Sequence, residues 1–529
     1  MKRISFFFLL CINYILFSQI STVGVIQYNE GVYEGYSLFS SNRDTYLISN
    51  CGRIVNTWES MYRPGLSVYL LEDGTLLRTH KVNNQLLQTL GAEDSPFFGG
   101  GIGGGIERFD WDGNIIWSYT YATNNVRAHH DIEPLPNGNI LILAWELKTA
   151  DEALSQGRNP SLLQDNLWPE HIIEIEPFGN SGANIVWEWH LWDHLIQDID
   201  PTLSNYGSIT DHPELININY VGPNSNTEGG PADWIHANSI DYNQDLDQIL
   251  ITSRIFSEFW IIDHSTTTEE AATNQGGNSG MGGSILYRWG NPEAYDRGDQ
   301  NDRALFGPHD AQWIDKDYPG ANNILIFNNG KDRPDGEYSS VDEIFLPLDG
   351  FNYEINIDEP YGPFYLEWTY VSSDPIDFFA DHISGCQRLP NGNTLICDGP
   401  QGRFFEVNNT GDIIWEYINP VYGNTILNQG SDPISVIDQG ASNSTFRFEK
   451  YSPEFLGFTD FILTEGLPIE GPPYIYPDLC LSTNLLEGDK AKKILQKIDI
   501  LGRKNSSKGI YIEIYNDGSV RKNYPSTYY

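Results

Sequence analysis

Two kinds of short strand unit alternate along the chain, and this repetition restricts the fold more than any other feature. One kind places a turn before an apolar strand, as in "PLPNGNILILAWE" at 134–146 and "RLPNGNTLICDG" at 388–399. The other kind ends on tryptophan, as in "WDGNIIWSYTY" at 111–121 and "NTGDIIWEYINP" at 409–420. Further turn–strand copies lie at 71–80, 243–254 and 318–330, and further tryptophan copies at 184–192, 284–292 and 365–370. About six alternations predict an all-β, six-bladed β-propeller, with inner hairpins from the first kind and outer strands from the second.

A large β-sandwich, or a pair of them, is the competing architecture. Helical patterns are scarce, because no long stretch keeps apolar residues three and four apart, so both alternatives are all-β. Only the propeller accounts for the repetition. With 529 residues, the chain is long enough for a large propeller.

Both ends of the chain differ from the repeats. Lys2, Arg3 and the apolar stretch 4–17 are typical of a secretory signal, which predicts a signal peptide at 1–19. The propeller is expected over 20–480, followed by a short β module at 481–529. The module resembles the C-terminal sorting signal of the type IX secretion system, in "IDILGRK" and "GIYIEIYNDGSV". The alternative is a final hairpin that closes the propeller. A secreted or cell-surface protein that passes through the periplasm is expected, with the type IX machinery as a partner.

Acidic residues outnumber basic ones by 72 to 31, which gives a formal charge of −41. Such a charge repels nucleic acid and anionic membranes, so neither is an expected partner. No membrane span is expected either. An anionic substrate needs a locally positive pocket.

Two local patterns lead to structural expectations. A two-residue turn at Asn391-Gly392 pairs Cys386 with Cys397, so these residues form either a cross-strand disulfide or two free buried thiols. The glycine-rich stretches 98–109 and 274–284 lack the lysine of a phosphate loop, and both are expected to be surface loops.

Five of the 11 histidines occupy similar settings just before the inner strands. They are His129, His130, His236, His309 and His382. Equivalent positions of successive blades converge at one end of a propeller channel, so these side chains are expected to meet. The other six lack this setting and are expected to be structural or on the surface: His80, His171, His190, His194, His212 and His264.

Neutral imidazoles support two kinds of chemistry: nucleophilic catalysis or transition-metal binding. Arg254 and Arg333 follow the strands after His236 and His309, and cations aimed into a channel favour an anionic group over a metal ion. Asn238 adds a neutral donor. No metal or other cofactor is therefore expected.

The order of these motifs resembles the bacterial arylsulfate sulfotransferases. The likeness runs from about residue 22 through "AHHDIEPLPNGNILIL", "DWIHANSIDYN", "PHDAQW" and "LIFNNG" to about Tyr417. It implies a six-bladed propeller that moves a sulfuryl group from a phenolic sulfate to a phenol without the nucleotide donor of cytosolic sulfotransferases. A histidine carries the group transiently.

The resemblance also implies roles for individual residues. His309 corresponds to the nucleophile, and His236, Asn238 and Arg254 correspond to the sulfate-binding set. His130-Asp131 mirrors His309-Asp310, so His130 fits the remaining catalytic histidine better than His129. A late polar residue is expected near His382 or Ser384. His129, Arg333 and His382 complete the expected substrate contacts.

Aryl sulfates and phenols are therefore the expected partners. Two alternatives remain open at this point: a non-catalytic extracellular propeller that binds sulfated ligands, and a metal-dependent hydrolase.

Overall fold

The computed structural model describes residues 21–222, 225, 230–431 and 442–481, and three strands at 494–499, 511–515 and 520–523. The expected signal peptide lies outside these residues. The chain divides into a unit that ends at Ile475 and a second unit from Tyr476 onward. The described part of the second unit is an antiparallel sheet of β34 (Ile494–Asp499), β35 (Tyr511–Tyr515) and β36 (Val520–Asn523).

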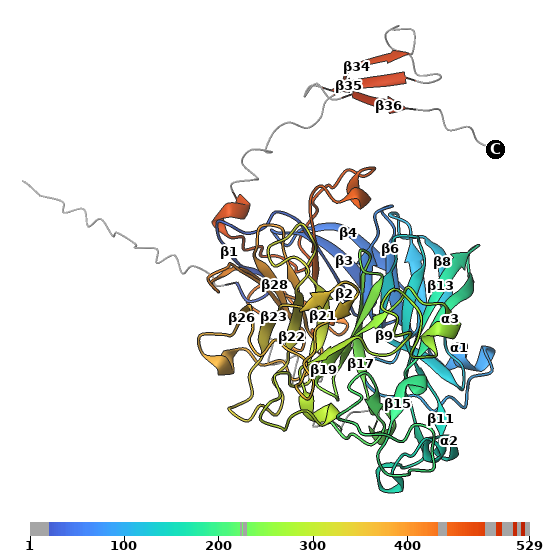
Figure 1. Ribbon diagram of the computed structural model, residues 1–529. Coiled ribbons are helices and arrows are strands. Elements are labelled where there is room, and N and C mark those ends of the chain that lie inside the picture. The colour runs from blue at the N-terminus through green and yellow to red at the C-terminus, as the bar shows by residue number, and fades with distance from the viewer. Residues whose placement is uncertain are drawn as a thin grey trace, which may run out of the picture. The chain divides into compact units, whose positions relative to one another are not determined.

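Six antiparallel sheets form the blades of a β-propeller in the first unit, which confirms the expected fold and excludes a sandwich (Figure 1). Blade 1 comprises β2 (Tyr36–Ser41), β3 (Asp44–Ser49), β4 (Ile54–Glu59) and β33 (Glu449–Tyr451). Blade 2 comprises β5 (Pro64–Leu70), β6 (Leu76–Lys81), β7 (Gly104–Phe109) and β8 (Ile115–Thr120). Blade 3 comprises β9 (Val126–Pro134), β10 (Ile140–Glu146), β13 (Glu170–Phe178) and β14 (Gly182–His190). Blade 4 comprises β17 (Ala237–Asn243), β18 (Gln248–Ser253), β19 (Glu258–Asp263) and β20 (Tyr287–Trp289).

Blade 5 comprises β21 (His309–Trp313), β22 (Ile324–Asn328), β23 (Ser340–Ile344) and β26 (Trp368–Tyr370). Blade 6 comprises β27 (Gly385–Arg388), β28 (Thr394–Asp398), β29 (Arg403–Val407), β30 (Ile413–Ile418) and an outer fifth strand, β1 (Gly24–Tyr28). Two strands from opposite ends of the chain therefore close the ring. The N-terminal strand β1 completes blade 6, and the late strand β33 supplies the innermost strand of blade 1.

Short elements decorate the loops between strands. Two-stranded pairs are β11 (Lys148–Thr149) with β12 (Asn166–Leu167), β15 (Leu195–Ile196) with β16 (Ile216–Asn217), β24 (Leu348–Asp349) with β25 (Asn352–Tyr353), and β31 (Val421–Tyr422) with β32 (Thr425–Ile426). The α-helices within the described part of the first unit are α1 (Asn84–Thr89), α2 (Ala150–Ser155) and α3 (Thr268–Ala271). Single 3₁₀ turns span Pro160–Leu162, Leu191–His194, Gly230–Ala232, Pro292–Tyr295, Pro375–Asp377 and Leu456–Phe458.

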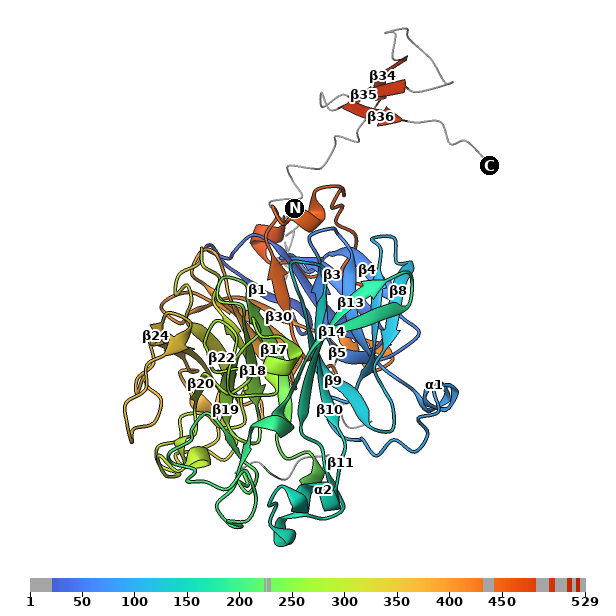
Figure 2. The same ribbon diagram turned by 45° about the vertical axis from the view of Figure 1, so that its right-hand side comes forward.

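The inner strands β5, β9 and β17 lie side by side along the middle of the ring (Figure 2). Hydrophobic cores fill the spaces between neighbouring blades. Leu77 and Trp117 of blade 2, for example, pack with Ile142 and Ile173 of blade 3. Strands in the middle of a blade are packed on both faces and can be apolar on both sides, as in the fully buried strand β10.

Several of the repeated tryptophans join their own blade to the next. The indole nitrogen of Trp58 donates to Asp110 O at 2.9 Å, that of Trp117 to Gly182 O at 3.0 Å, and that of Trp415 to Asn50 O at 2.8 Å. Each acceptor lies in the following blade, near the start of its outer strand. A tryptophan at this position supplies apolar area and satisfies its own buried N–H, which explains why it recurs.

The hairpin of blade 6 has a different register from the one expected. Leu389 N donates to Asn393 O at 2.9 Å, so the loop contains three residues and ends on Gly392 with a φ of 88°. The extra residue pairs Cys386 with Ile396 and places Gly385 opposite Cys397. The two cysteines therefore face the cores on opposite sides of the blade, as free buried thiols rather than a disulfide.

Acidic side chains line part of the channel. Glu449 and Asp241, with Glu133 and Asp310, border a cavity of about 200 Å³. Burial raises the pKa of Glu449 to about 7; the charges of Asp310 and Asp131 also raise it, and that of Arg447 lowers it. A buried carboxyl with a raised pKa destabilises the folded chain when it is ionised, compared with its neutral form.

The variant Glu449→Gln should therefore raise the melting temperature at pH 8 and change it little at pH 5. A raised pKa means that the contribution of Glu449 to stability is complete below the pKa of the unfolded chain, near 4.5. This contribution is lost as the pH rises through about 7, and the neutral amide escapes the loss. Scanning calorimetry at both pH values measures the effect, with the exposed Glu354→Gln as control. Equal shifts at the two pH values would contradict it.

Candidate active site

Bulges in three successive inner strands aim the candidate histidines. His130 and His236 have φ of 47° and 51°, and Asp310, directly after His309, has a φ of 58°. The register of β9 against β10 and of β21 against β22 shifts around His130 and Asp310, and that of β17 against β18 shifts between Ala237 and Ser239, directly after His236. Left-handed backbone at a bulge redirects a side chain, and such strain is held in place by the surrounding sheet.

The redirected side chains form one cluster. The rings of His130 and His236 meet edge to face with centroids 4.8 Å apart. His309 is 2% exposed, and burial lowers its pKa well below the usual value. The positive charge of Arg254 lowers it further. His309 is therefore a neutral imidazole at neutral pH, beside a guanidinium.

Asn329 fixes the tautomer of His309. The Asn329 amide nitrogen donates to Ala380 O at 2.7 Å and to Ile383 O at 2.9 Å, so its Oδ1 faces His309 Nδ1 at 2.7 Å. An amide oxygen only accepts, hence Nδ1 carries the hydrogen and Nε2 carries the lone pair. Asn329 follows β22 as Arg254 follows β18, so two successive blades use the same position. That equivalence was the available sequence signal for Asn329, which sequence analysis missed.

Carboxylates orient the other histidines. His236 Nδ1 bonds to the buried Asp233 Oδ2, three residues earlier. His129 Nε2 lies 2.9 Å from Glu170 Oε2, and its Nδ1 lies 2.9 Å from His130 Nδ1. The ring of His129 stacks on Trp145 with centroids 4.1 Å apart.

Because Nδ1 of His130 faces Nδ1 of His129, Nε2 of His130 is the ring atom available to a ligand. Burial lowers the pKa of His129 to about 3 and that of His130 well below its usual value. The positive charge of Arg254 also lowers the pKa of His130. His129 thus supports His130, and both rings are neutral.

The other candidate residues occupy different places. Asn238 is fully buried and donates to Pro308 O at 2.8 Å, directly before His309. Arg254 donates to Asp381 O at 3.4 Å, beside the half-exposed His382, which bonds to the Asp381 carboxylate. Ser384 is buried, and its hydroxyl accepts from Gly399 N at 3.0 Å. Arg333 donates to Tyr338 O and Ser340 Oγ, and these contacts hold its guanidinium within blade 5.

A buried arginine behind the cluster was not anticipated. Arg447 forms ion pairs with Asp131 at 2.7 Å and Asp310 at 2.8 Å. Tyr69 donates to Asp131 at 2.8 Å. Asp131 and Asp310 directly follow His130 and His309, so one guanidinium links the bulges of β9 and β21.

The first glycine-rich stretch is not a surface loop over 101–105, because four of these residues are buried and Ile102 is half-buried. A Cβ on Gly101 would lie 1.9 Å from His130 Cε1, and Gly101 O accepts from His130 N at 2.8 Å. Gly101 has a φ of 75°, so only glycine fits against this ring without strain. The second stretch is a loop without strands, exposed at 274, 275, 278 and 280 but buried at 282–284, so it is a surface loop only in part.

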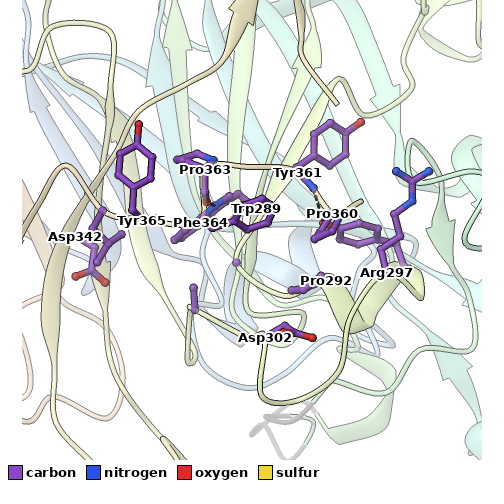
Figure 3. Close-up of a pocket in the computed structure, with 14 residues that line it drawn as sticks. Trp289, Pro292, Arg297, Asp302, Asp342, Pro360, Tyr361, Pro363, Phe364 and Tyr365 are labelled. Carbon is purple, nitrogen blue, oxygen red and sulfur yellow. Dashed lines mark hydrogen bonds between the residues drawn. The ribbon is translucent and has the colours of Figure 1, made fainter. Parts of the chain in front are cut away.

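An aromatic pocket of about 420 Å³ lies outside this cluster, between β20 and the segment before β26 (Figure 3). Trp289, Tyr295, Tyr361 and Phe364 contribute its rings. None of the candidate histidines lines it. The chemistry-bearing residues are in the channel cluster instead.

Fold and site together define a six-bladed β-propeller with buried neutral histidines and an arginine at its channel. A family model described as "Arylsulfotransferase (ASST)" matches residues 59–421, and the chain belongs to this family. No curated protein matches the chain. Within the described residues, no helix is long and apolar enough to cross a membrane.

Solved structures resemble the chain only distantly. A protein of unknown function from Bacteroides caccae is 12% identical, with a TM-score of 0.37, covering 72% of this chain and 93% of the other. A protein from Lactobacillus plantarum is 8% identical, with a TM-score of 0.36, covering 79% and 100%. A catalytically inactive virginiamycin B lyase from Staphylococcus aureus, solved with quinupristin, is 10% identical, with a TM-score of 0.33, covering 75% and 89%.

Proposed function

We propose that the protein transfers a sulfuryl group from a phenolic sulfate to a phenol through a covalent intermediate on His309. Membership of the arylsulfotransferase family supports aryl sulfotransfer in general. The observation that carries the specific proposal is His309 itself. It is buried and neutral, with Nδ1 held by Asn329 and the Nε2 lone pair left for attack.

The first half-reaction forms an Nε2–S bond on His309 while the S–O bond to the aryl group breaks. The phenolate leaves with the bonding electron pair and takes up a proton. In the second half-reaction an acceptor phenol attacks sulfur and loses its proton, and the N–S bond returns its electrons to the imidazole. Sulfuryl transfer leaves charge on the peripheral oxygens, as phosphoryl transfer does.

Fixed donors around His309 suit that charge. Arg254 supplies a cation, and its effect on the pKa of His309 and His130 indicates that its field reaches both rings. His236 and His130 complete the set that holds the sulfate oxygens, with His129 positioning His130 and Asn238 holding the backbone directly before His309. Removing one such donor typically raises a barrier by about 3–4 kcal/mol. A locally positive pocket is needed because the whole chain carries a charge of −41.

The proposal extends to where the protein works. The charged and apolar start of the chain supports export through a signal peptide at 1–19. The resemblance of the C-terminal module to type IX sorting signals supports release at the cell surface, with both segments removed from the mature protein.

Incubation of the purified chain with a chromogenic aryl sulfate tests the function directly. We expect release of the coloured phenolate, faster release when a second phenol is added, and a sulfated form of that phenol. A chelator should leave the rate unchanged. Absence of turnover would instead favour a propeller that only binds sulfated ligands, and loss of activity with chelator would favour a metal-dependent hydrolase.

A further inference from the structure

Two histidines and a glutamate converge on one point on blade 3. His171 lies on β13 directly opposite His190 on β14, and Glu188 is two residues before His190 on the same face. His171 Nε2 lies 3.2 Å from Glu188 Oε2, and His190 Nε2 lies 3.6 Å from the same oxygen. Within the described residues, this is the group whose ligand atoms all lie within 4.8 Å of one another.

The opposite nitrogen of each ring is held from behind. His190 Nδ1 lies 3.3 Å from Glu146 Oε2, and Glu146 pairs with Lys148 at 2.9 Å. His171 Nδ1 lies 3.5 Å from the Tyr121 hydroxyl. Metal-binding histidines commonly engage their second nitrogen in this way, because an outer carboxylate or hydroxyl fixes the ring and the tautomer.

We propose that His171, His190 and Glu188 bind a divalent transition-metal ion, with zinc as the best match. Two imidazole nitrogens and one carboxylate oxygen are a common zinc donor set, and a water molecule completes four-fold coordination. The His190 and Glu188 side chains are 31% and 35% exposed, which leaves a path for the ion and its water. This site is independent of sulfuryl transfer.

The two imidazole rings share one carboxylate partner. The two rings stack at 4.1 Å with an angle of 15°, and both present Nε2 to a single carboxylate oxygen. A divalent cation would satisfy both imidazole nitrogens and the carboxylate oxygen once the stacked rings tilt from parallel, because each imidazole lone pair lies in the plane of its ring. The strongly acidic chain favours cations as well.

Titration of the untagged, chelator-treated full chain with zinc chloride in a calorimeter tests the site, and cobalt absorption reports its geometry. We expect one equivalent of zinc and a four-coordinate cobalt spectrum. His171→Ala, His190→Ala and Glu188→Gln should each weaken zinc binding by about tenfold or more, since each removes one of three ligands. Glu188→Gln keeps the shape of a partly exposed side chain, so it tests the site even if a histidine variant fails to fold.

Two controls separate this site from general histidine binding. His212→Ala removes an exposed histidine that pairs only with Glu214, and it should leave zinc affinity unchanged. His309→Asn should do the same, because the channel cluster is not the proposed site. The proposal is overturned if the wild-type chain binds no zinc, or if the Glu188→Gln and His190→Ala variants bind it as tightly as the wild type.

Discussion

Replacing His309 by asparagine is expected to lower the turnover of an aryl sulfate by about 10⁴-fold or more, since losing a nucleophile costs most of the catalysis. Asparagine offers no lone pair of comparable basicity in place of Nε2. The remaining donors, including Arg254 and His236, still bind the sulfate but have no group to accept it. The rate of phenolate release at saturating donor measures the effect.

The same variant should keep its fold. His309 is buried in a polar cluster rather than in the hydrophobic cores between blades, so its loss removes little apolar packing. Circular dichroism and the melting temperature check this, and the exposed His212→Asn provides a matched histidine control. If His309→Asn turns over donor at a rate comparable to the wild type, His309 is not the nucleophile, and His236 or His130 takes its place.

Replacing Arg447 by alanine is expected to destabilise the fold by about 3–5 kcal/mol, the usual cost of removing one partner from a buried ion pair. Asp131 and Asp310 would lose their common cation, and both are almost fully buried. Arg447 lies just before β33 of blade 1, and its ion pairs join this segment to blades 3 and 5. Its loss therefore weakens contacts across the channel. Urea denaturation monitored by tryptophan fluorescence gives the free energy of unfolding.

An exposed pair supplies the comparison. Arg108→Ala removes the ion pair with the half-exposed Asp73, and such surface pairs contribute at most about 1 kcal/mol. Adding Asp310→Asn to Arg447→Ala should recover part of the lost stability, because one of the two unpaired carboxylates becomes neutral. If Arg447→Ala lowers the free energy of unfolding no more than Arg108→Ala does, the ion pairs of Arg447 with Asp131 and Asp310 contribute little to stability.

The repeat pattern predicted the blades because each unit carries its own physical signal. The turns mark inner hairpins, and the outer tryptophans recur since each one closes the space to the next blade. The register of the blade 6 hairpin was beyond reach, because the same Asn391-Gly392 sequence fits a two-residue or a three-residue loop. One residue of difference placed Cys386 and Cys397 on opposite faces.

The candidate site was predictable where it followed the repeat. His130, His236 and His309 precede the turn–strand units at equivalent positions, and the rings of the first two are in contact. Arg447 and Glu170 do not occupy equivalent positions of the sequence repeat. Arg447 comes from the segment that closes blade 1, far from its partners in sequence, and Glu170 reaches His129 from a strand edge. Which of these residues touch substrate stays a prediction.

Trapping the intermediate tests the central claim most directly. The wild-type chain is mixed with a donor labelled with radioactive sulfur, in the absence of acceptor, and quenched within milliseconds under alkaline conditions that preserve nitrogen-linked sulfate. The account predicts about one label per chain, carried by the peptide that contains His309, acid-labile and discharged by added phenol. Label on a different residue, or turnover without any labelled protein, would contradict it.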